Sequence, residues 1–270
     1  MDGGGWIWAA EGGGWAEGVV RGRGVSGEIE RPLREITAAR LSLGTSGEAV
    51  STRESLRFQM DHALARDAVH AAMDVALLVR ELEERGVESL VMRSAVTGGR
   101  QEYLRRPDLG RRLAVESREL LRGAASLPAA EVVFVVADGL SALAVERHAL
   151  GLMDALRKRL GEWTVGPVCL VTQGRVAVGD EIGELLAAKV VVMLIGERPG
   201  LSASDSLGVY VTWEPRVGRT DAERNCVSNV RDGGLGYVEA AERVVGLMRG
   251  AKALGASGVG LKDGEEVKLL

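Results

Sequence analysis

The sequence predicts an α/β fold with a mostly parallel sheet in its second half, preceded by a helical region. Three apolar, β-branched runs indicate strands, at 132–136, 168–171 and 190–195. Helical patterns at 142–160 and 180–188 separate these runs. Strands that alternate with helices are typical of βαβ units and a parallel sheet, and strands buried on both faces are almost wholly apolar. We therefore expect these runs to form the centre of one sheet.

We expect three regions along the 270 residues. Residues 1–30 hold ten glycines and three of the five tryptophans, which predicts a flexible tail. Residues 31–125 carry helical patterns, and residues 126–270 carry the strands. The elements expected inside these regions are helices at 33–40, from the cap at 51 to about 84, at 111–123 and at 237–252, and strands at 209–211 and 259–261.

Composition excludes several kinds of partner. The formal net charge is −4, so no global basic field draws the chain to nucleic acid or to an anionic membrane. Apolar stretches stay well below the roughly 18–20 residues needed to span a bilayer. The two cysteines, Cys169 and Cys226, do not form a Cys-x-x-Cys pair. This cysteine usage fits a reducing cytoplasm and argues against a zinc site or a disulfide scaffold.

The turn after the run 168–171 is the first place to expect a ligand, because ligands of open α/β sheets bind outside the carboxyl ends of the strands. Gly174 and Gly179 bound this turn and resemble half of a phosphate-binding loop. Asp180 and Glu181 follow where that loop needs a lysine and a hydroxyl, which argues against a nucleoside triphosphatase. The remaining interpretation is a tight turn that exposes Arg175 and backbone groups to a bulky partner.

Two further strand ends carry polar residues whose roles the sequence leaves open. Asp138 and Ser141 follow the run 132–136; Ser141 could cap the next helix, and Asp138 either binds a ligand or serves the turn, with turn chemistry favoured. Glu197 and Arg198 follow the run 190–195. They either meet a ligand or pair with each other or with other surface charges.

One polar stretch and a few motifs complete the candidates. The stretch 221–229 is predicted to be a recognition loop, in which packing is the favoured role of Cys226. His62 and His70 lie about 80° apart around an ideal helix, so they are poor candidates for a shared metal. His148 is predicted at the surface or behind a site. The G-x-G-x-x-G at 22–27 lacks a flanking strand and helix, which favours a linker over a nucleotide site.

Six segments together resemble one known family, the small subunit of ethanolamine ammonia-lyase. The match runs in order from about residue 33 to residue 262 and leaves the first 30 residues uncovered. The segments that carry it are FQMDHALARDAVH (58–70), YLRRPDLGRRL (103–113), ADGLSA (137–142), QGRVAVGDEIG (173–183), GERPGL (196–201) and DAERNCVSN (221–229).

The resemblance implies a hetero-oligomeric, adenosylcobalamin-dependent enzyme that converts ethanolamine to acetaldehyde and ammonia. It implies a Rossmann-like cobalamin-binding domain at 126–270 and a large subunit, a TIM barrel, that holds the substrate and most of the chemistry. The cobalamin contacts that it implies are Val176, Glu197 and Cys226, and we add Arg175 because of its charge and position. The sequence lacks the Asp-x-His-x-x-Gly motif with which many cobalamin domains supply a histidine to cobalt, so dimethylbenzimidazole is expected to remain the lower ligand.

The remaining expectations concern activity, location and alternatives. We expect the isolated chain to be inactive, because no catalytic constellation is visible in the sequence. The expected location is the cytoplasm, with the interior of a bacterial microcompartment as an alternative for which the first 30 residues could be responsible. Two other interpretations stay open: a non-catalytic Rossmann-like binding or assembly module, and a nucleotide-dependent enzyme that uses the turn at Gly174.

Overall fold

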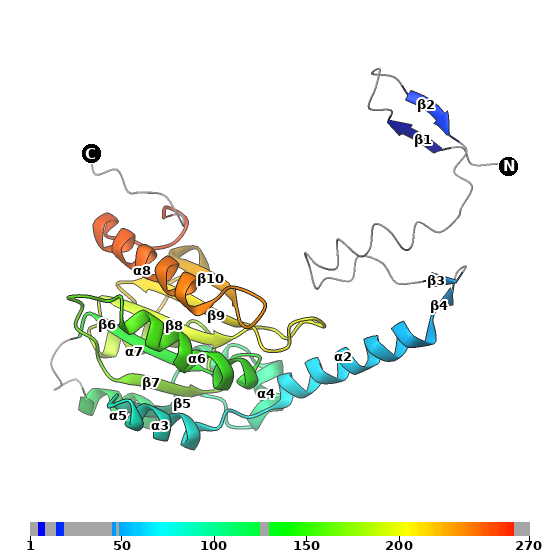
Figure 1. Ribbon diagram of the computed structural model, residues 1–270. Coiled ribbons are helices and arrows are strands. Elements are labelled where there is room, and N and C mark those ends of the chain that lie inside the picture. The colour runs from blue at the N-terminus through cyan, green and yellow to red at the C-terminus, as the bar shows by residue number, and fades with distance from the viewer. Residues whose placement is uncertain (1–4, 9–14, 19–44, 47–48, 125–129, 262–270) are drawn as a thin grey trace. The chain divides into compact units, whose positions relative to one another are not determined.

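The computed structural model describes residues 5–8, 15–18, 45–46, 49–124 and 130–261 (Figure 1). The chain divides into two compact units, residues 1–59 and 60–270. In the first unit, β1 (Gly5–Trp8) pairs antiparallel with β2 (Trp15–Gly18), and β3 (Thr45–Ser46) pairs with β4 (Ala49–Val50). These short strands were not predicted from the sequence. The helix expected at 33–40 lies outside the described residues.

A six-stranded sheet forms the centre of the second unit, in the order β10-β9-β8-β6-β7-β5. Four neighbouring strands, β5, β7, β6 and β8, are parallel, whereas β9 and β10 continue the sheet antiparallel. The expected mostly parallel sheet is therefore present, with its parallel strands running from β8 to the edge strand β5. The strands are β5 (Ser89–Arg93), β6 (Val132–Ala137), β7 (Val168–Thr172), β8 (Val190–Gly196), β9 (Leu207–Trp213) and β10 (Arg224–Val230).

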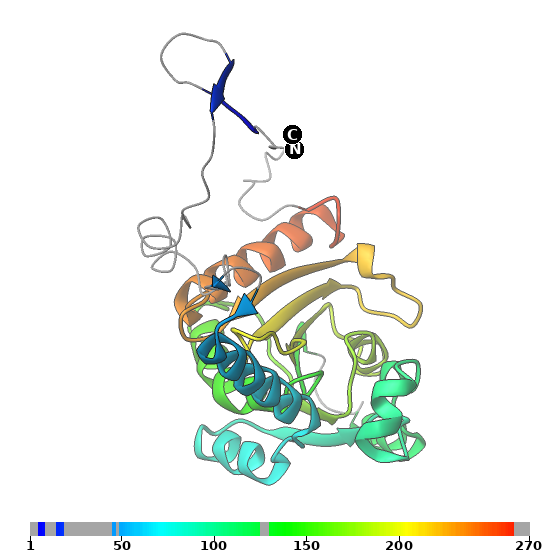
Figure 2. The same cartoon turned by 90° about the vertical axis from the view of Figure 1, so that its right-hand side faces the viewer.

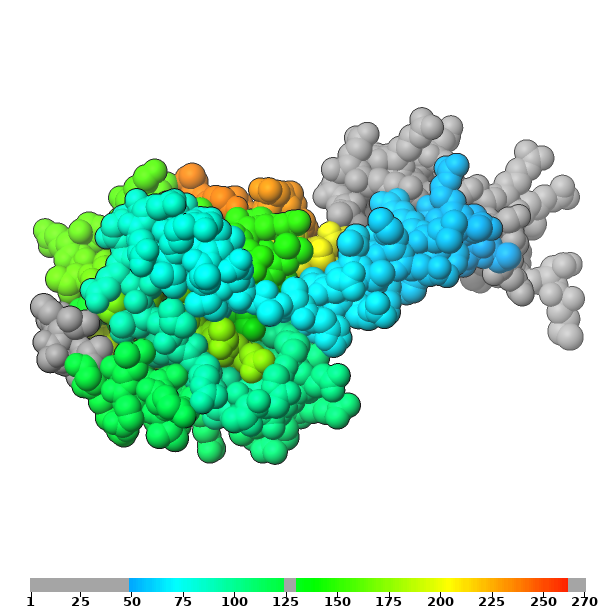
Figure 3. Space-filling view, turned by 90° about the horizontal axis from the view of Figure 1, so that it is seen from below, coloured from blue at the N-terminus to red at the C-terminus, as the bar shows by residue number. Residues whose placement is uncertain are grey.

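Helices cover both faces of this sheet and make a three-layer arrangement. One core cluster joins alternate residues of the central strands to α3 (Val75–Glu84), α6 (Ala142–Arg157) and α8 (Tyr237–Leu254). The other joins the opposite residues to α5 (Val115–Ala124) and α7 (Val178–Leu185). In Figure 2, α8 lies alongside β9 and β10. Figure 3 looks towards the β5 edge, with α3 in cyan on one side and α5 in green on the other.

Three sequence expectations about strands are wrong. The region 31–125 is not wholly helical, because β5 lies within it and pairs in parallel with β7. The stretch 221–229 is not a loop: it forms a 3-10 turn, Asp221–Glu223, and most of the edge strand β10. The edge strand expected at 259–261 is absent, since these residues form a turn and a bend.

The long helix expected between 51 and 84 is two helices, α2 (Thr52–His70) and α3. Asp74 starts the second one, because its side chain accepts a hydrogen bond from the N–H of Leu77 at 2.9 Å. The expected cap at Gly86 is confirmed, with φ of +65° just past α3. The apolar face expected on α2 is present but exposed at Leu56 and Leu64.

The remaining helical elements are the short helix α4 (Gly99–Arg105) and the 3-10 turn Leu109–Arg111, which lie between β5 and α5. Among the described residues, no helix combines the length and the hydropathy that crossing a bilayer requires.

Candidate functional site

The carboxyl ends of the parallel strands meet at one edge of the sheet and enclose a cavity. Its volume is about 410 Å³, and it opens between the ends of β6, β7 and β8 with a residue of β9 on one side. This is the edge at which ligands of α/β sheets bind. The residues that line it are Gly139, Leu140, Arg175, Val176, Ile195, Gly196, Glu197, Arg198 and Tyr210.

The turn after β7 is held by contacts on several sides. A side chain at Gly174 would meet Cβ of Ala137 at 2.9 Å, so the expected close approach of backbone is confirmed. The hydroxyl of Tyr103 donates to the Gly174 carbonyl at 2.9 Å, and the N–H of Arg175 donates to the Gly110 carbonyl at 2.7 Å. The turn is thus anchored by α4 and the 3-10 turn that follows it. These contacts present Arg175 and Val176 to the cavity.

Asp138 forms hydrogen bonds with other groups of this chain. Its carboxylate accepts from the N–H of Gly174 at 3.3 Å and from the guanidinium of Arg100 at 3.2 Å. Burial raises the pKa of Asp138 to about 6, although Arg100 acts in the opposite direction. The favoured turn role therefore agrees with the structure. Ser141 caps α6 as expected, since its hydroxyl accepts from the N–H of Ala144 at 3.2 Å.

Glu197 lies across the backbone of β9. Its carboxylate accepts a hydrogen bond from the Ser206 hydroxyl and one from the N–H of Asn229 at 3.3 Å. The carboxylate packs closely on Gly208, since a Cβ there would lie 2.9 Å from an oxygen of Glu197 and would displace it. Within the described residues, Glu197 and Arg198 form no ion pair with each other, so mutual pairing, one of the possibilities left open by the sequence, is not observed.

Cys226 lies beside the cavity and not in its lining. It pairs across the ladder with Tyr210, which does line the cavity, so the two residues share one face of the sheet. The residue is exposed, yet desolvation by surrounding atoms raises the pKa of its thiol. The group is therefore a neutral thiol at neutral pH, which suits packing better than nucleophilic attack.

The helix that follows the β7 turn is fastened by two carboxylates in its first turn. Asp180 forms a buried ion pair with Arg224 of β10, and Glu181 pairs with Arg118 of α5. Glu181 also accepts from the N–H of Leu113 at 2.8 Å. Asp180 and Glu181, which stand where a phosphate-binding loop would have a lysine and a hydroxyl residue, thus fix the position of α7. The sequence showed these carboxylates but not their arginine partners.

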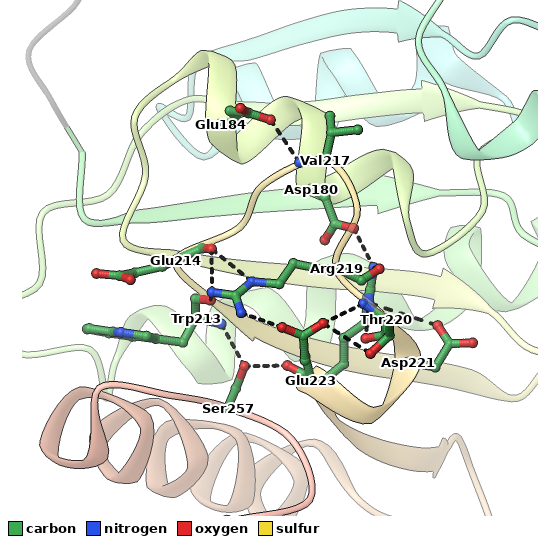
Figure 4. A network of polar contacts seen from close by, with 11 residues as sticks. Asp180, Glu184, Trp213, Glu214, Val217, Arg219, Thr220, Asp221, Glu223 and Ser257 are labelled. Carbon is green, nitrogen blue, oxygen red and sulfur yellow. Dashed lines mark hydrogen bonds and ion pairs between the residues drawn. The ribbon is translucent and has the colours of Figure 1, made fainter.

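Figure 4 shows the network around Asp180, which extends from α7 to the start of β10 and the loop before it. Glu223 receives hydrogen bonds from Arg219 and from the N–H of Thr220, at 2.5 and 2.7 Å. These bonds lower the pKa of Glu223 to about 2. Ser257 links the network to the segment after α8 by donating to the Glu223 carbonyl at 2.6 Å.

The described residues contain no group of histidine, cysteine and carboxylate side chains that could hold a metal ion. His148 is buried, so the surface position, one of the two expected for it, is not observed, and its Nδ1 lies 2.8 Å from the Tyr237 hydroxyl. Its Nε2 lies 3.5 Å from Asp205. The G-x-G-x-x-G motif at 22–27 lies outside the described residues.

Fold and site together define a class: an α/β protein with a cavity at the carboxyl ends of its parallel strands, lined by charged and apolar side chains. Comparison with known proteins identifies the family. The family model described as ethanolamine ammonia-lyase light chain (EutC) matches residues 28–262.

Three relatives illustrate the similarity, each named ethanolamine ammonia-lyase small subunit. Those of Pseudomonas fluorescens (strain Pf0-1) and Azotobacter vinelandii are each 54% identical over 242 residues, which is 88% of this chain and 88% and 89% of theirs. That of Pseudomonas aeruginosa (strain PAO1) is 55% identical over 243 residues, or 88% of this chain and 89% of its own. The chain belongs to the ethanolamine ammonia-lyase light chain family, and it is a small-subunit component of that lyase.

Proposed function

We propose that this small subunit binds adenosylcobalamin at the strand-end cavity and holds it against the large subunit. One observation carries the proposal: the three contact positions implied by the sequence resemblance converge in space although they are far apart in the chain. Val176 and Glu197 line the same cavity of about 410 Å³, and Cys226 pairs with the lining residue Tyr210.

The donor and acceptor set of the cavity fits such a ligand. The rim of a cobalamin carries amide groups, which need both acceptors and donors. Glu197 supplies acceptor oxygens, held in place by Ser206 and Asn229. Arg175 supplies donors, and its buried Nε has no hydrogen-bond partner in the part of the chain that the structure describes. Val176 offers an apolar contact beside them.

The size of the cavity supports a shared binding site. A volume of about 410 Å³ is much smaller than a cobalamin, so this chain can enclose only part of the cofactor. The rest of the enclosure must come from the large subunit, which in the family that the sequence resembles is a TIM barrel with the substrate site. An exposed apolar face on α2, with Leu56 and Leu64 about half or more exposed, is consistent with a subunit that assembles with another chain.

When bound, adenosylcobalamin supplies the radical chemistry for deaminating ethanolamine, and the protein supplies binding and orientation. The residues of this chain act on position: Glu197 and the β7 turn fix one side of the cofactor and exclude water from it. Direct catalytic roles belong to the large subunit in this proposal. We therefore expect the purified small subunit alone to release no ammonia from ethanolamine.

Titration of the co-expressed complex with cobalamin, followed by corrin absorbance, tests the proposal. Glu197→Ala removes the acceptor and should weaken cobalamin binding about tenfold or more, since a hydrogen bond to a charged group contributes roughly 1.5–3 kcal/mol. The KM for ethanolamine should stay nearly unchanged. Glu162→Ala is a matched control, because Glu162 is exposed and lies near the amino ends of the parallel strands, at the end of the sheet opposite to the cavity. Equal cobalamin affinity of the Glu197→Ala and wild-type complexes would refute the assignment.

Location is a separate proposal: the enzyme works in the cytoplasm, and residues 1–30 direct the complex into a bacterial microcompartment where the host forms one. Deleting these residues and following a fluorescently tagged complex in cells tests this directly. Unchanged localisation after the deletion would assign the segment no targeting role.

A further inference from the structure

Two arginines at the cavity have no carboxylate partner within the described residues. Arg175 comes from the turn after β7 and Arg198 from the end of β8, and both line the cavity of about 410 Å³. We propose that these two arginines form a subsite for a phosphate ester, and that its occupant is the phosphodiester of the bound cobalamin. The identity of the occupant rests on the cofactor proposed above; the anion subsite itself rests on the geometry below.

Arg175 is held in place before any ligand arrives. Its guanidinium lies over the ring of Tyr103 at 4.3 Å from the ring centroid, and the ring is fully buried. A Cβ at Gly110 would lie 2.9 Å from Cγ of Arg175, so the stem of the side chain packs closely on backbone. The buried Nε nevertheless has no acceptor. The guanidinium makes no hydrogen bond within the described residues, although polar groups in such surroundings are normally hydrogen-bonded, and its terminal nitrogens, unlike Nε, are not buried. They are the donors left for a ligand.

The carboxylates nearest to these arginines are already engaged by other groups. Asp138 accepts from Arg100 and from the N–H of Gly174, and Glu197 accepts from Ser206 and Asn229. The lining therefore holds two arginines and one carboxylate, Glu197, so positive charge remains in excess there.

Arg175 and Arg198 also repel each other. Desolvation, together with the charges of Arg100 and Arg198, lowers the pKa of Arg175 from its ordinary value. Arginine stays charged in proteins, so this arrangement costs free energy in the empty cavity. A bound anion offsets that cost.

The backbone adds donors to the same place. The N–H groups of Val176 and Ala177 have no acceptor among the described residues, and they lie directly before α7. Unused amides at a helix start favour an anion, and arginine forks match the oxygens of a phosphate. A phosphate oxygen could therefore receive hydrogen bonds from both arginine side chains and from the backbone.

Corrinoids with and without the phosphodiester distinguish this subsite from the rest of the cofactor site. The complex with the large subunit is titrated with cobalamin and with cobinamide, which lacks the nucleotide and its phosphate, by corrin absorbance. Arg198→Gln is the main variant, because Arg198 is exposed and its loss should leave folding intact. Arg175→Lys keeps the charge but not the fork. Arg216→Gln, an exposed arginine after β9, is the control.

The expected result for Arg198→Gln is a loss of cobalamin affinity of at least about tenfold, with less than about a twofold change for cobinamide. Arg175→Lys also loses donors to the amide rim that both corrinoids carry, so it should weaken the binding of both, and of cobalamin more strongly. Arg216→Gln should change neither. Equal losses for both corrinoids, or no loss with cobalamin, would overturn the assignment of the phosphodiester.

A last arm separates the subsite from the proposed cofactor function. Failure of the wild-type complex to bind either corrinoid would overturn the cofactor proposal and leave the anion subsite to be judged with inorganic phosphate. A rise in melting temperature with inorganic phosphate that is lost in Arg198→Gln would then support a subsite for free phosphate. The absence of any such rise would reject the subsite as well.

Discussion

Removing Asp180 tests whether the buried ion pair fixes α7 to β10. The side chains of Asp180 and Arg224 are only 4% and 1% exposed. Asp180→Ala would leave the Arg224 guanidinium buried, with backbone carbonyls such as that of Thr220 as acceptors and the exposed Asp221, 3.9 Å away, as its remaining carboxylate. Breaking a buried pair from one side costs about 3–5 kcal/mol, so the free energy of unfolding should fall by that amount.

Urea unfolding of the purified protein, monitored by circular dichroism, measures this loss from the midpoint and the slope. The double variant Asp180→Ala with Arg224→Met removes both charges, and it should be more stable than Asp180→Ala alone because no unpaired charge remains. Glu119→Ala breaks an exposed pair with Arg122, 61% and 59% exposed, and should change stability by less than about 1 kcal/mol. A similarly small loss for Asp180→Ala would refute the inference that Arg224 is shielded from water.

Three other predictions concern packing, pH and cobalt ligation. Gly183→Ala should lower the melting temperature, because the added Cβ would lie 2.3 Å from Cγ of Pro215 and overpacking costs about 1–3 kcal/mol. Gly246→Ala in α8 is the control: the space around Gly246 is open, so this change should be neutral or slightly stabilising. The pKa of Asp138 is raised to about 6 in the folded state, so protonation of Asp138 stabilises the fold fully below about pH 4, and this contribution is lost as the pH rises through 6. In urea titrations, the free energy of unfolding of the wild-type protein should therefore fall by up to about 3 kcal/mol between these pH values, relative to that of Asp138→Asn. EPR of the cobalamin-loaded complex with ¹⁵N-labelled histidine should show no histidine nitrogen on cobalt, because the chain lacks the Asp-x-His-x-x-Gly motif and His148 is buried beside Tyr237. A ¹⁵N-dependent splitting would contradict this.

The central strands were predictable because burial on both faces leaves an almost wholly apolar sequence. All residues of β6 and β8 are buried, which is the pattern read from 132–136 and 190–195. The edge strands were not predictable in this way. The sequence of β10, RNCVSNV, alternates buried and exposed residues irregularly, and its polar side chains suggested a loop. β5 is short and only Met92 within it is buried.

The loops of the candidate site could be predicted from the sequence, but the contacts that hold these loops in place could not. Ends of parallel strands meet at one edge of a sheet, so the turns at Gly174 and Glu197 could be expected to lie together. The contacts that orient these turns join distant parts of the chain: Tyr103 reaches the Gly174 carbonyl across 71 residues, and Arg224 reaches Asp180 across 44. Neither partner has a local signature, because residue type and spacing do not encode contacts of that range.

The irregular edge strand β10 also matters for the subunit before it assembles with its partner, because an exposed edge strand can pair with another copy. A newly made subunit must stay separate until it meets its partner, and a straight outer strand would invite a second copy to extend the sheet. The pairing of β10 shifts register between Val227 and Val230, and Asn229 takes a left-handed backbone conformation with φ of +62°. This distortion interrupts the row of outward-facing amides and carbonyls that such an extension needs. The same strand that carries Cys226 thus offers a second copy only an interrupted hydrogen-bonding edge.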